Sequence, residues 1–197
     1  MEISQGQMIA TCSLDGMIRI WRTPEFKIVT EFDDIDKKDN AKFKHINGVR
    51  GMDYTPELGG NIVCFGYSTY LNVWSPDSSL SKSFVGRLEG HQAIIVVCKM
   101  FPLSSNCITA DERCNIKIWE LRNLMPIASI RNEGPIGSLI TAIAIFPETD
   151  SFVLGGKRIQ IYRNLATSEQ MDAGFDEKMP RYAFFNSYFR AFFVMTQ

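Results

Sequence analysis

One short pattern occurs four times along the chain, and it constrains the fold more than any other feature. In each copy an apolar residue, a polar residue, a second apolar residue and an aromatic residue follow in that order. The copies end the segments MIRIW (residues 17–21), YLNVW (70–74), NIKIW (115–119) and RIQIY (158–162). Such alternation is typical of β-strands. The aromatics lie 53, 45 and 43 residues apart, so the pattern predicts one repeated β unit.

Other markers recur at the same period. In two units a histidine precedes a proline by 11 residues, and in a third an isoleucine takes the place of the histidine. The pairs are His45 with Pro56, His91 with Pro102, and Ile136 with Pro147. Strand-like stretches flank these markers, which gives about four short strands per unit. A four-stranded sheet cannot bury both of its faces alone, so we predict sheets stacked around an axis, as in an all-β propeller.

The chain is predicted to hold three complete units and two partial ones in a single propeller segment, residues 1–197. The units cover approximately 1–32, 45–86, 90–130, 136–164 and 180–197, with inserted loops at 33–44 and 165–180. This count would leave a sheet face and strand edges exposed at each end. We therefore expect a segment of a larger propeller, completed by a second chain or by further sequence. The less favoured alternative is a small ring closed by the C-terminal strands.

The repeat resembles the WD-repeat family, whose units run from a Gly-His pair to a Trp-Asp pair. Gly90-His91 matches the opening, and SLDGMIRIW, with its Asp15-Gly16 turn, matches the closing hairpin. The Asp after Trp is absent from every unit. The resemblance implies blades that are each pinned by hydrogen bonds among His, Ser or Thr, Asp and Trp. Ser68 and Arg113 replace the turn Asp in the next two units, so no unit is expected to assemble all four groups.

Charge and composition exclude several classes of function. The 197 residues are 45% hydrophobic and carry a formal net charge of −1, which gathers neither nucleic acid nor anionic lipid. The apolar runs are too short to span a bilayer, and the start does not read as a secretory signal. Five cysteines without a Cys-x-x-Cys pair indicate reduced thiols in an intracellular protein. We therefore expect no nucleic-acid partner and no membrane partner.

No catalytic, cofactor-binding or metal-binding residue is predicted. His45 and His91 recur at the repeat period, which favours a structural role for both. The acidic run at residues 33–40 lacks the features of a calcium loop, because Asp39 stands where the turn Gly is needed and His45 where the bidentate Glu is needed. The GGK sequence at residues 155–157 lacks the spacing of a phosphate-binding loop. We predict no enzyme activity.

Two further groups of side chains are assigned to the framework. The polar residues two positions before each aromatic are expected to form a solvated strand face: Arg19, Asn72, Lys117 and Gln160. The aromatic-rich segment 182–193 aligns with the first two strands of a unit and is expected to be core. The inserted loops are interpreted as tolerated surface loops, with docking of partners as the alternative.

The predicted function is a scaffold for protein–protein interaction. The stretch at residues 90–124, with its ITAD sequence and its Glu-x-Arg-Asn step, is similar to long WD-repeat proteins of cilia and flagella, as is the shortened GGKRIQIY hairpin. This resemblance implies a component of the ciliary axoneme, within the cytoskeleton of the cytoplasm, in an assembly that includes microtubule-associated proteins. The alternatives are a soluble WD-repeat adaptor and the regulatory propeller of a larger enzyme. The fold alone does not separate them.

Overall fold

The computed structural model describes residues 2–3, 7–33, 48–55, 60–76, 84–131, 140–146, 151–156, 159–163, 169–172, 180–186 and 191–196. Every regular element in these residues is a β-strand. The predicted all-β class is therefore confirmed. A helix long and apolar enough to cross a membrane does not occur in this part of the chain.

The strands form five antiparallel sheets, called sheets 1 to 5 in chain order. Sheet 1 contains β1 (Glu2–Ile3), β2 (Met8–Cys12), β3 (Met17–Arg22) and β4 (Lys27–Asp33). Sheet 2 contains β5 (Val49–Thr55), β6 (Asn61–Gly66), β7 (Tyr70–Trp74) and β8 (Phe84–Glu89). Sheet 3 contains β9 (Ile95–Met100), β10 (Asn106–Asp111), β11 (Asn115–Glu120) and β12 (Met125–Arg131). Sheet 4 contains β13 (Ala142–Phe146), β14 (Ser151–Gly155), β15 (Ile159–Arg163) and β16 (Glu169–Asp172), and sheet 5 contains β17 (Pro180–Asn186) and β18 (Ala191–Thr196).

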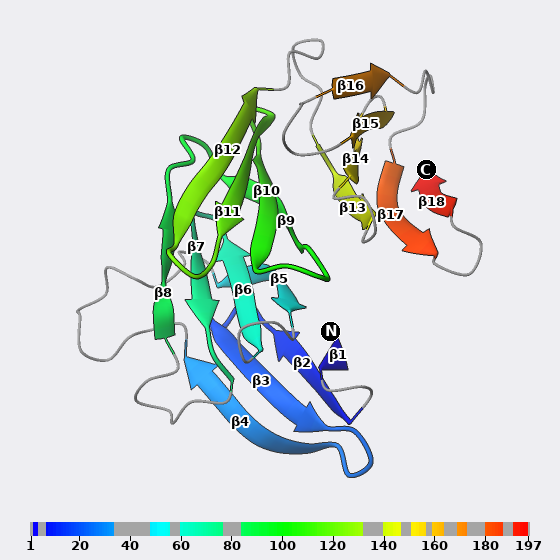
Figure 1. The fold of residues 1–197 in the computed structure, drawn as a ribbon. Helices are drawn as coiled ribbons and strands as arrows, with labels where there is room; N and C mark the ends of the chain where they lie inside the picture. The colour runs from blue at the N-terminus through cyan, green and yellow to red at the C-terminus, as the bar shows by residue number, and fades with distance from the viewer. Residues whose placement is uncertain are drawn as a thin grey trace.

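The sheets follow one another along an arc, from sheet 1 at the blue end to sheet 5 at the red end (Figure 1). Contacts join β2 to β5, β5 to β9, β9 to β13 and β13 to β17. From sheet 2 onward, the first strand of each sheet therefore neighbours the first strand of the next, as in blades that radiate from an axis. The fold is that of a partial β-propeller.

Because side chains alternate along a strand, successive residues of one strand pack against two different neighbouring sheets. Trp119 of β11 lies in a buried cluster with Val63 and Leu71 of sheet 2. Ile116 and Ile118 of the same strand belong to another cluster, shared with sheet 4. Both faces of a middle strand are thus buried, and this explains why a single sheet of this kind needs a neighbour on each side.

A repeated backbone hydrogen bond joins successive sheets. Val49 N, at the start of β5, donates to the carbonyl oxygen of Ser13 in the β2–β3 turn at 3.1 Å. Ile95 N, at the start of β9, donates in the same way to Ser68 in the β6–β7 turn at 3.0 Å. In sheets 1 and 2, the turn between the second and third strands therefore holds the first strand of the following sheet.

The close approach of sheets 1 and 2 at the bond between Val49 and Ser13 depends on a glycine. Gly48 precedes β5 and has a φ of 82°, a conformation that favours glycine. A Cβ atom added at Gly48 would lie 2.1 Å from the carbonyl oxygen of Leu14. Because that neighbour is backbone, it cannot rotate away, so only glycine lets the two sheets meet here.

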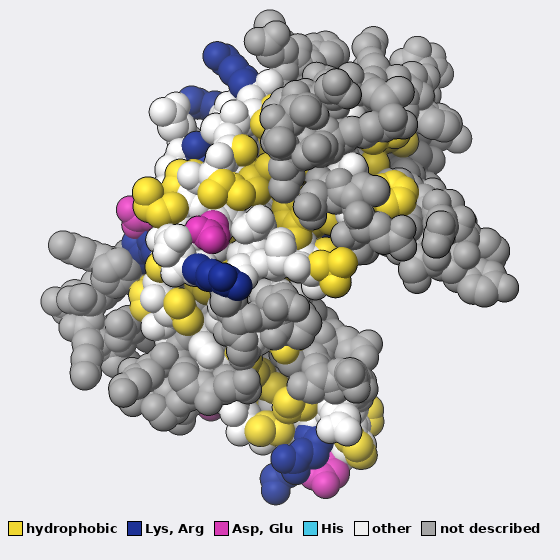
Figure 2. Space-filling view, in the orientation of Figure 1, with side chains coloured by type: hydrophobic (Ala, Val, Ile, Leu, Met, Phe, Trp, Pro, Cys, Tyr) yellow, Lys and Arg dark blue, Asp and Glu magenta, His cyan; other side chains and the backbone are white. Residues whose placement is uncertain are grey.

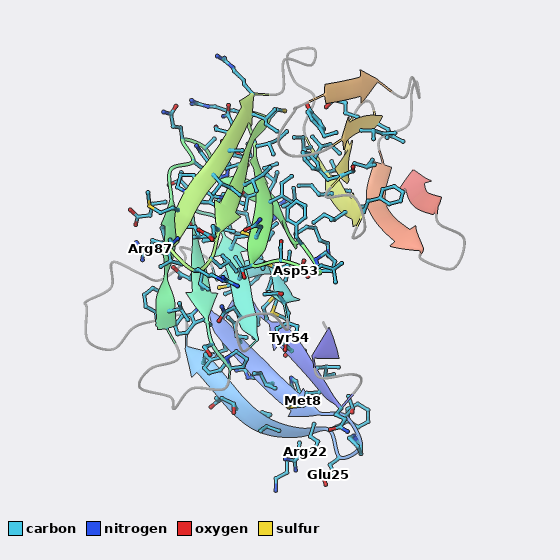
Figure 3. All side chains as sticks on the ribbon, in the orientation of Figure 1. Met8, Arg22, Glu25, Asp53, Tyr54 and Arg87 are labelled. Carbon is cyan, nitrogen blue, oxygen red and sulfur yellow. The ribbon has the colours of Figure 1, made fainter. Side chains whose placement is uncertain are left out.

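A side chain makes a further link between sheets 2 and 3. The Asp53 carboxylate in β5 accepts a hydrogen bond from Met100 N in β9 at 2.8 Å, and Lys99 Nζ lies 3.5 Å from the same oxygen. Asp53 lies where the two sheets meet (Figure 3). The inner strands are thus joined by polar contacts as well as by apolar packing.

Two strands differ from the sequence prediction. The first unit was counted as partial, but β1 pairs with β2 and gives sheet 1 four strands. Part of the predicted loop 165–180 is strand β16, which pairs with β15. Both elements are short, and β16 is mostly polar, so their own side chains carry little signal and their backbone pairing defines them.

Some predictions fall on residues that the structure does not describe. These are the repeat markers His45, Pro56, Ile136 and Pro147, and residues 34–44 of the first inserted loop. The same holds for the side chains of the aromatic-rich segment 182–193, although β17 and β18 pair along it. The expected core role of these aromatics stays a prediction.

Candidate protein interface

Four side chains of sheet 3 form a continuous, buried hydrogen-bond network. Trp119 Nε1 donates to Thr109 Oγ1 at 2.8 Å, and Thr109 Oγ1 lies 2.7 Å from His91 Nε2. His91 Nδ1 lies 3.0 Å from Asp111 Oδ2. The side chains of His91 and Asp111 are fully buried. The network ties the segment before β9 to strands β10 and β11, so it fixes the three inner strands of the sheet together.

Asp111 is held by the turn that follows it. Its Oδ1 accepts hydrogen bonds from Arg113 N and Asn115 N, each at 2.9 Å, and Asn115 Nδ2 donates to both carboxylate oxygens. Burial raises the pKa of Asp111, but the bonds from Asn115 and from His91 outweigh it and leave the pKa below its ordinary value. The carboxylate is therefore ionised at neutral pH.

His91 is neutral in this site. Burial lowers the pKa of His91, and the neighbouring Asp111 carboxylate raises it. The effect of burial is the larger one, so the pKa lies below its ordinary value. With a single ring proton, the network assigns that proton to Nδ1, which donates to Asp111, while Nε2 accepts from the Thr109 hydroxyl. Thr109 Oγ1 also lies 3.3 Å from the carbonyl oxygen of Lys117, but the shorter contact to His91 takes its single hydrogen. The chain of donors then runs from Trp119 to Thr109 to His91 to Asp111.

The protonation of His91 gives a testable pH dependence. Because its pKa is lower in the folded state than in the unfolded chain, the unfolded chain binds the proton more tightly. The contribution of His91 to stability is therefore complete above about pH 6.5 and is lost as the pH falls from there toward the folded pKa. We expect the free energy of unfolding, measured in urea by circular dichroism, to fall between pH 7 and pH 5.

A His91→Gln variant is the control for this measurement. It should be less stable at pH 7 and should lose most of the decrease between pH 7 and pH 5. A wild-type free energy of unfolding that is flat or rises as the pH is lowered would show that His91 is not held neutral.

The network corrects the expectation that no unit could assemble all four groups. That expectation looked for the acidic residue at the turn position held by Asp15 in sheet 1, where sheet 3 has Arg113. In the structure the acid comes two residues earlier, at Asp111, and still reaches His91. The signal was present in the ITAD sequence, whose threonine and aspartate are both members of the network.

Sheet 1 contains part of the same arrangement. Trp21 Nε1 donates to Thr11 Oγ1 at 2.8 Å, the same length as the bond between Trp119 and Thr109. Asp15 accepts from Met17 N at 2.9 Å and pairs with Arg19 at 3.1 Å. The pairing register places Thr11 opposite Arg19, so these groups share one face of the sheet.

Sheets 2 and 4 replace the hydroxyl of this network with apolar groups. Cys64 and Leu154 occupy the register position of Thr109, and both are buried. In sheet 4 the aromatic is Tyr162, which stacks on Phe152 with ring centroids 4.8 Å apart. The buried Tyr162 hydroxyl has no hydrogen-bond partner among the described residues. The hydroxyl that links histidine and tryptophan in sheet 3 is therefore absent from this position in sheets 2 and 4.

The expected solvated column is wrong for two of its four members. Asn72 is 0% exposed and Gln160 is 7% exposed, whereas Arg19 and Lys117 are half-buried. Asn72 accepts a hydrogen bond from Arg87 Nε at 3.3 Å. The strand periodicity correctly predicted that the polar residue and the aromatic residue of each unit share one face of the sheet. In sheets 2 and 4 the preceding sheet, rather than water, covers that face.

The outer strands carry an exposed aliphatic residue at an equivalent place. In sheets 1, 2 and 3 the register shifts beside the tryptophan, and one residue of the outer strand is left unpaired in a β-bulge. These residues are Val29, Val85 and Ile127, which are 46%, 43% and 53% exposed. Hydrophobic side chains accordingly reach the surface in several separate places (Figure 2). The bulges also protect each outer edge from uncontrolled pairing.

Comparison with known proteins supports the interpretation of the fold. Residues 3–22, which span β1 to β3, match the family described as WD domain, G-beta repeat. The comparisons support the WD-repeat family. Over 102 residues, 52% of this chain, the sequence is 26% identical to Elongator complex protein 2 of Saccharomyces cerevisiae. The match covers 13% of that protein's length.

WD-repeat domains bind other proteins, and proteins of this kind are generally non-catalytic scaffolds. Neither comparison supports the predicted likeness to proteins of cilia and flagella. Within the described ranges, no cluster of three or more His, Cys, Asp or Glu side chains is placed to hold a metal ion.

Proposed function

We propose that this chain is a non-catalytic scaffold that holds other proteins together in a multi-protein assembly. The observation that carries the proposal is the arc of stacked sheets in which polar groups serve the framework. His91 and Asp111 are both fully buried in the network of sheet 3. Among the described residues, the surface includes turns, bulged outer strands and exposed aliphatic side chains, which suit partner proteins better than a small substrate.

Two settings for such a scaffold are distinguishable. The resemblance of residues 90–124 to axonemal propellers favours a place in the ciliary cytoskeleton. The likeness to Elongator complex protein 2, whose name assigns it to a complex, favours a subunit of a protein complex. A soluble adaptor and a regulatory propeller attached to an enzyme both fall within the second setting.

Fractionation of the native protein from ciliated cells tests the proposal. Cilia are isolated, stripped with detergent and washed with high salt, while the remaining cell extract is separated by gel filtration, and the chain is followed by mass spectrometry. Retention on the axoneme would support the axonemal setting. Elution from the extract in a particle much heavier than 22.4 kDa, with stable companions, would support a soluble assembly. Elution from the extract without companions, and absence from the axoneme, would overturn the scaffold.

A further inference from the structure

One end of sheet 3 differs in charge from the same end of sheet 1. The register of the third strand with the outer strand makes four positions equivalent: one in the turn before the third strand, one on that strand and two on the outer strand. In sheet 1 these positions hold Asp15, Arg19, Glu31 and Asp33. In sheet 3 they hold Arg113, Lys117, Ser129 and Arg131. Sheet 3 therefore has cations at positions where sheet 1 has mostly acidic residues.

The cations at this end of sheets 1 and 2 are balanced within each sheet. Arg19 Nη2 lies 3.1 Å from Asp15 Oδ2, and Arg19 Nε lies 3.6 Å from Glu31 Oε2. In sheet 2 the outer strand supplies both signs of charge, and Arg87 Nη1 lies 3.1 Å from Glu89 Oε1. Because two sheets of the same construction balance their cations internally, the positive charge of sheet 3 is not a requirement of the fold.

The cations of sheet 3 have no comparable acidic partner. We call Arg113, Lys117 and Arg131 the basic end of sheet 3. Arg113 and Arg131 are exposed, and Lys117 is half-buried. Within the described ranges, none of the three belongs to an ion pair. Lys117 Nζ donates to the Ser129 hydroxyl at 3.3 Å, and this contact leaves its charge unbalanced.

The acidic residues of sheet 3 do not cover the basic end. Asp111 is fully buried and bonds to His91. Glu120, at the other end of β11, accepts a hydrogen bond from Asn123 at 2.8 Å. Glu112 is exposed in the turn before Arg113, and the structure shows no ion pair for it in the part of the chain that it describes. Lys and Arg side chains accordingly gather at the surface where β12 ends, at the top of the view (Figure 2).

The spacing of the cations favours an extended acidic segment over a single anion. Arg131 lies opposite Asn115, and Lys117 lies two residues further along β11. Two residues of a strand span about 7 Å, so the charges form a row and do not converge on one point. Acidic side chains on alternate residues of an extended peptide recur at the same interval. The planar guanidinium groups of arginine also bind carboxylates in a two-pronged geometry.

We propose that the basic end of sheet 3 binds an acidic segment of a partner protein. Carboxylates of that segment pair with Arg113 and Arg131, and a further carboxylate lies beside Lys117. Sheets 2 and 4 both neighbour sheet 3 and leave the two arginines at the surface. The proposal rests on the scaffold function and names the chemistry of the partner.

Binding of a synthetic peptide to the native protein tests the proposal. The protein is produced in its own cells and purified, and its binding to a fluorescent peptide of alternating glutamate and serine is followed by fluorescence anisotropy. We expect saturable binding that weakens as the salt concentration is raised and is lost when glutamine replaces every glutamate. Equal binding of the glutamine peptide would overturn the proposal. So would no binding, which is the result expected if a segment of the same polypeptide already covers the basic end.

A matched pair of substitutions locates the binding surface. Arg131 and Arg122 are both exposed, and Arg122 lies in the β11–β12 turn at the opposite end of sheet 3. Arg131→Glu and Arg122→Glu change the net charge equally. We expect Arg131→Glu to weaken peptide binding at least about tenfold and Arg122→Glu to weaken it less than about twofold, with unchanged far-ultraviolet circular dichroism. Equal weakening would show that only the net charge matters and would contradict the proposal.

Crosslinking in native cells identifies the partner. Benzoylphenylalanine is placed at Ser129, which is exposed on the outer strand opposite Lys117. After irradiation, we expect mass spectrometry to find an adduct with a segment of another protein that is rich in aspartate and glutamate. No adduct, an adduct within this polypeptide, or an adduct with nucleic acid or with a segment that is not acidic would overturn the proposal.

Failure of this proposal is distinguishable from failure of the scaffold function. If fractionation recovers stable companions but none is crosslinked through an acidic segment, the scaffold function stands and the acidic partner is wrong. If the purified protein binds the acidic peptide but fractionation recovers no companions, the scaffold function is wrong and the basic end still binds carboxylates.

Discussion

Replacing Trp119 with alanine is expected to lower the free energy of unfolding by about 3–5 kcal/mol. Trp119 is 0% exposed and fills the interface between sheets 2 and 3. Its removal takes away a large apolar side chain, leaves a cavity against Val63 and Leu71, and removes the donor to Thr109. Urea unfolding followed by far-ultraviolet circular dichroism measures the change, because that signal comes mainly from the backbone and the midpoint and slope of the transition give the free energy.

Trp21→Ala is the matched control for this prediction. The two tryptophans occupy the same strand position and make the same bond to a threonine hydroxyl, but Trp21 is only half-buried. Less apolar surface is returned to water in this variant, so we expect a loss of about 1–2 kcal/mol. Equal losses for both variants would show that the burial of the indole ring does not set the size of the loss.

The repeated sheets could be predicted because their signal is local. The aromatic residues of the pattern lie in β3, β7, β11 and β15, the third strand of each four-stranded sheet. The alternation of apolar and polar residues indicates a strand whose two faces differ in polarity. This signal lies within the strand itself and does not depend on which sheets pack against it. The period of the aromatics then predicts stacked units without knowledge of any contact.

What could not be predicted depends on pairing and on neighbours. The bulges that expose Val29 and Val85 arise from a shift in register, which no single strand contains. Asn72 reads as a surface residue in a strand, yet the adjacent sheet buries it completely. β1 has two residues, too few for a periodic pattern, and only its pairing with β2 defines it.

The buried network was missed for a geometric reason. Sequence comparison aligned the turn residues one by one, which placed Arg113 opposite Asp15. The two turns have the same form, because Cys114 has a φ of 62° where Gly16 has 87°, and each N–H donates to the carbonyl oxygen three residues earlier. The acid of the network therefore stands at the position of Ser13, the first residue of that turn, and from there it reaches His91.

Substitution of Asp111 by alanine is the strongest test of that network. The change leaves the Nδ1–H of His91 without its acceptor in a buried site, and it removes the acceptor of the backbone N–H groups of Arg113 and Asn115 in the half-buried turn. Unsatisfied buried donors of this kind cost about 1–3 kcal/mol each, and they are not additive. We expect a total loss of about 3 kcal/mol or more in the free energy of unfolding, measured in urea at pH 7.

Asp15→Ala separates a buried network from an ordinary turn. Asp15 also bonds a backbone N–H and an arginine, but its side chain is 48% exposed and water replaces both contacts when it is removed. We expect a much smaller change than for Asp111→Ala. If the two variants lose the same stability, Asp111 acts only as a turn residue. The links from Asp111 through His91 to Trp119 would then add nothing measurable to the stability.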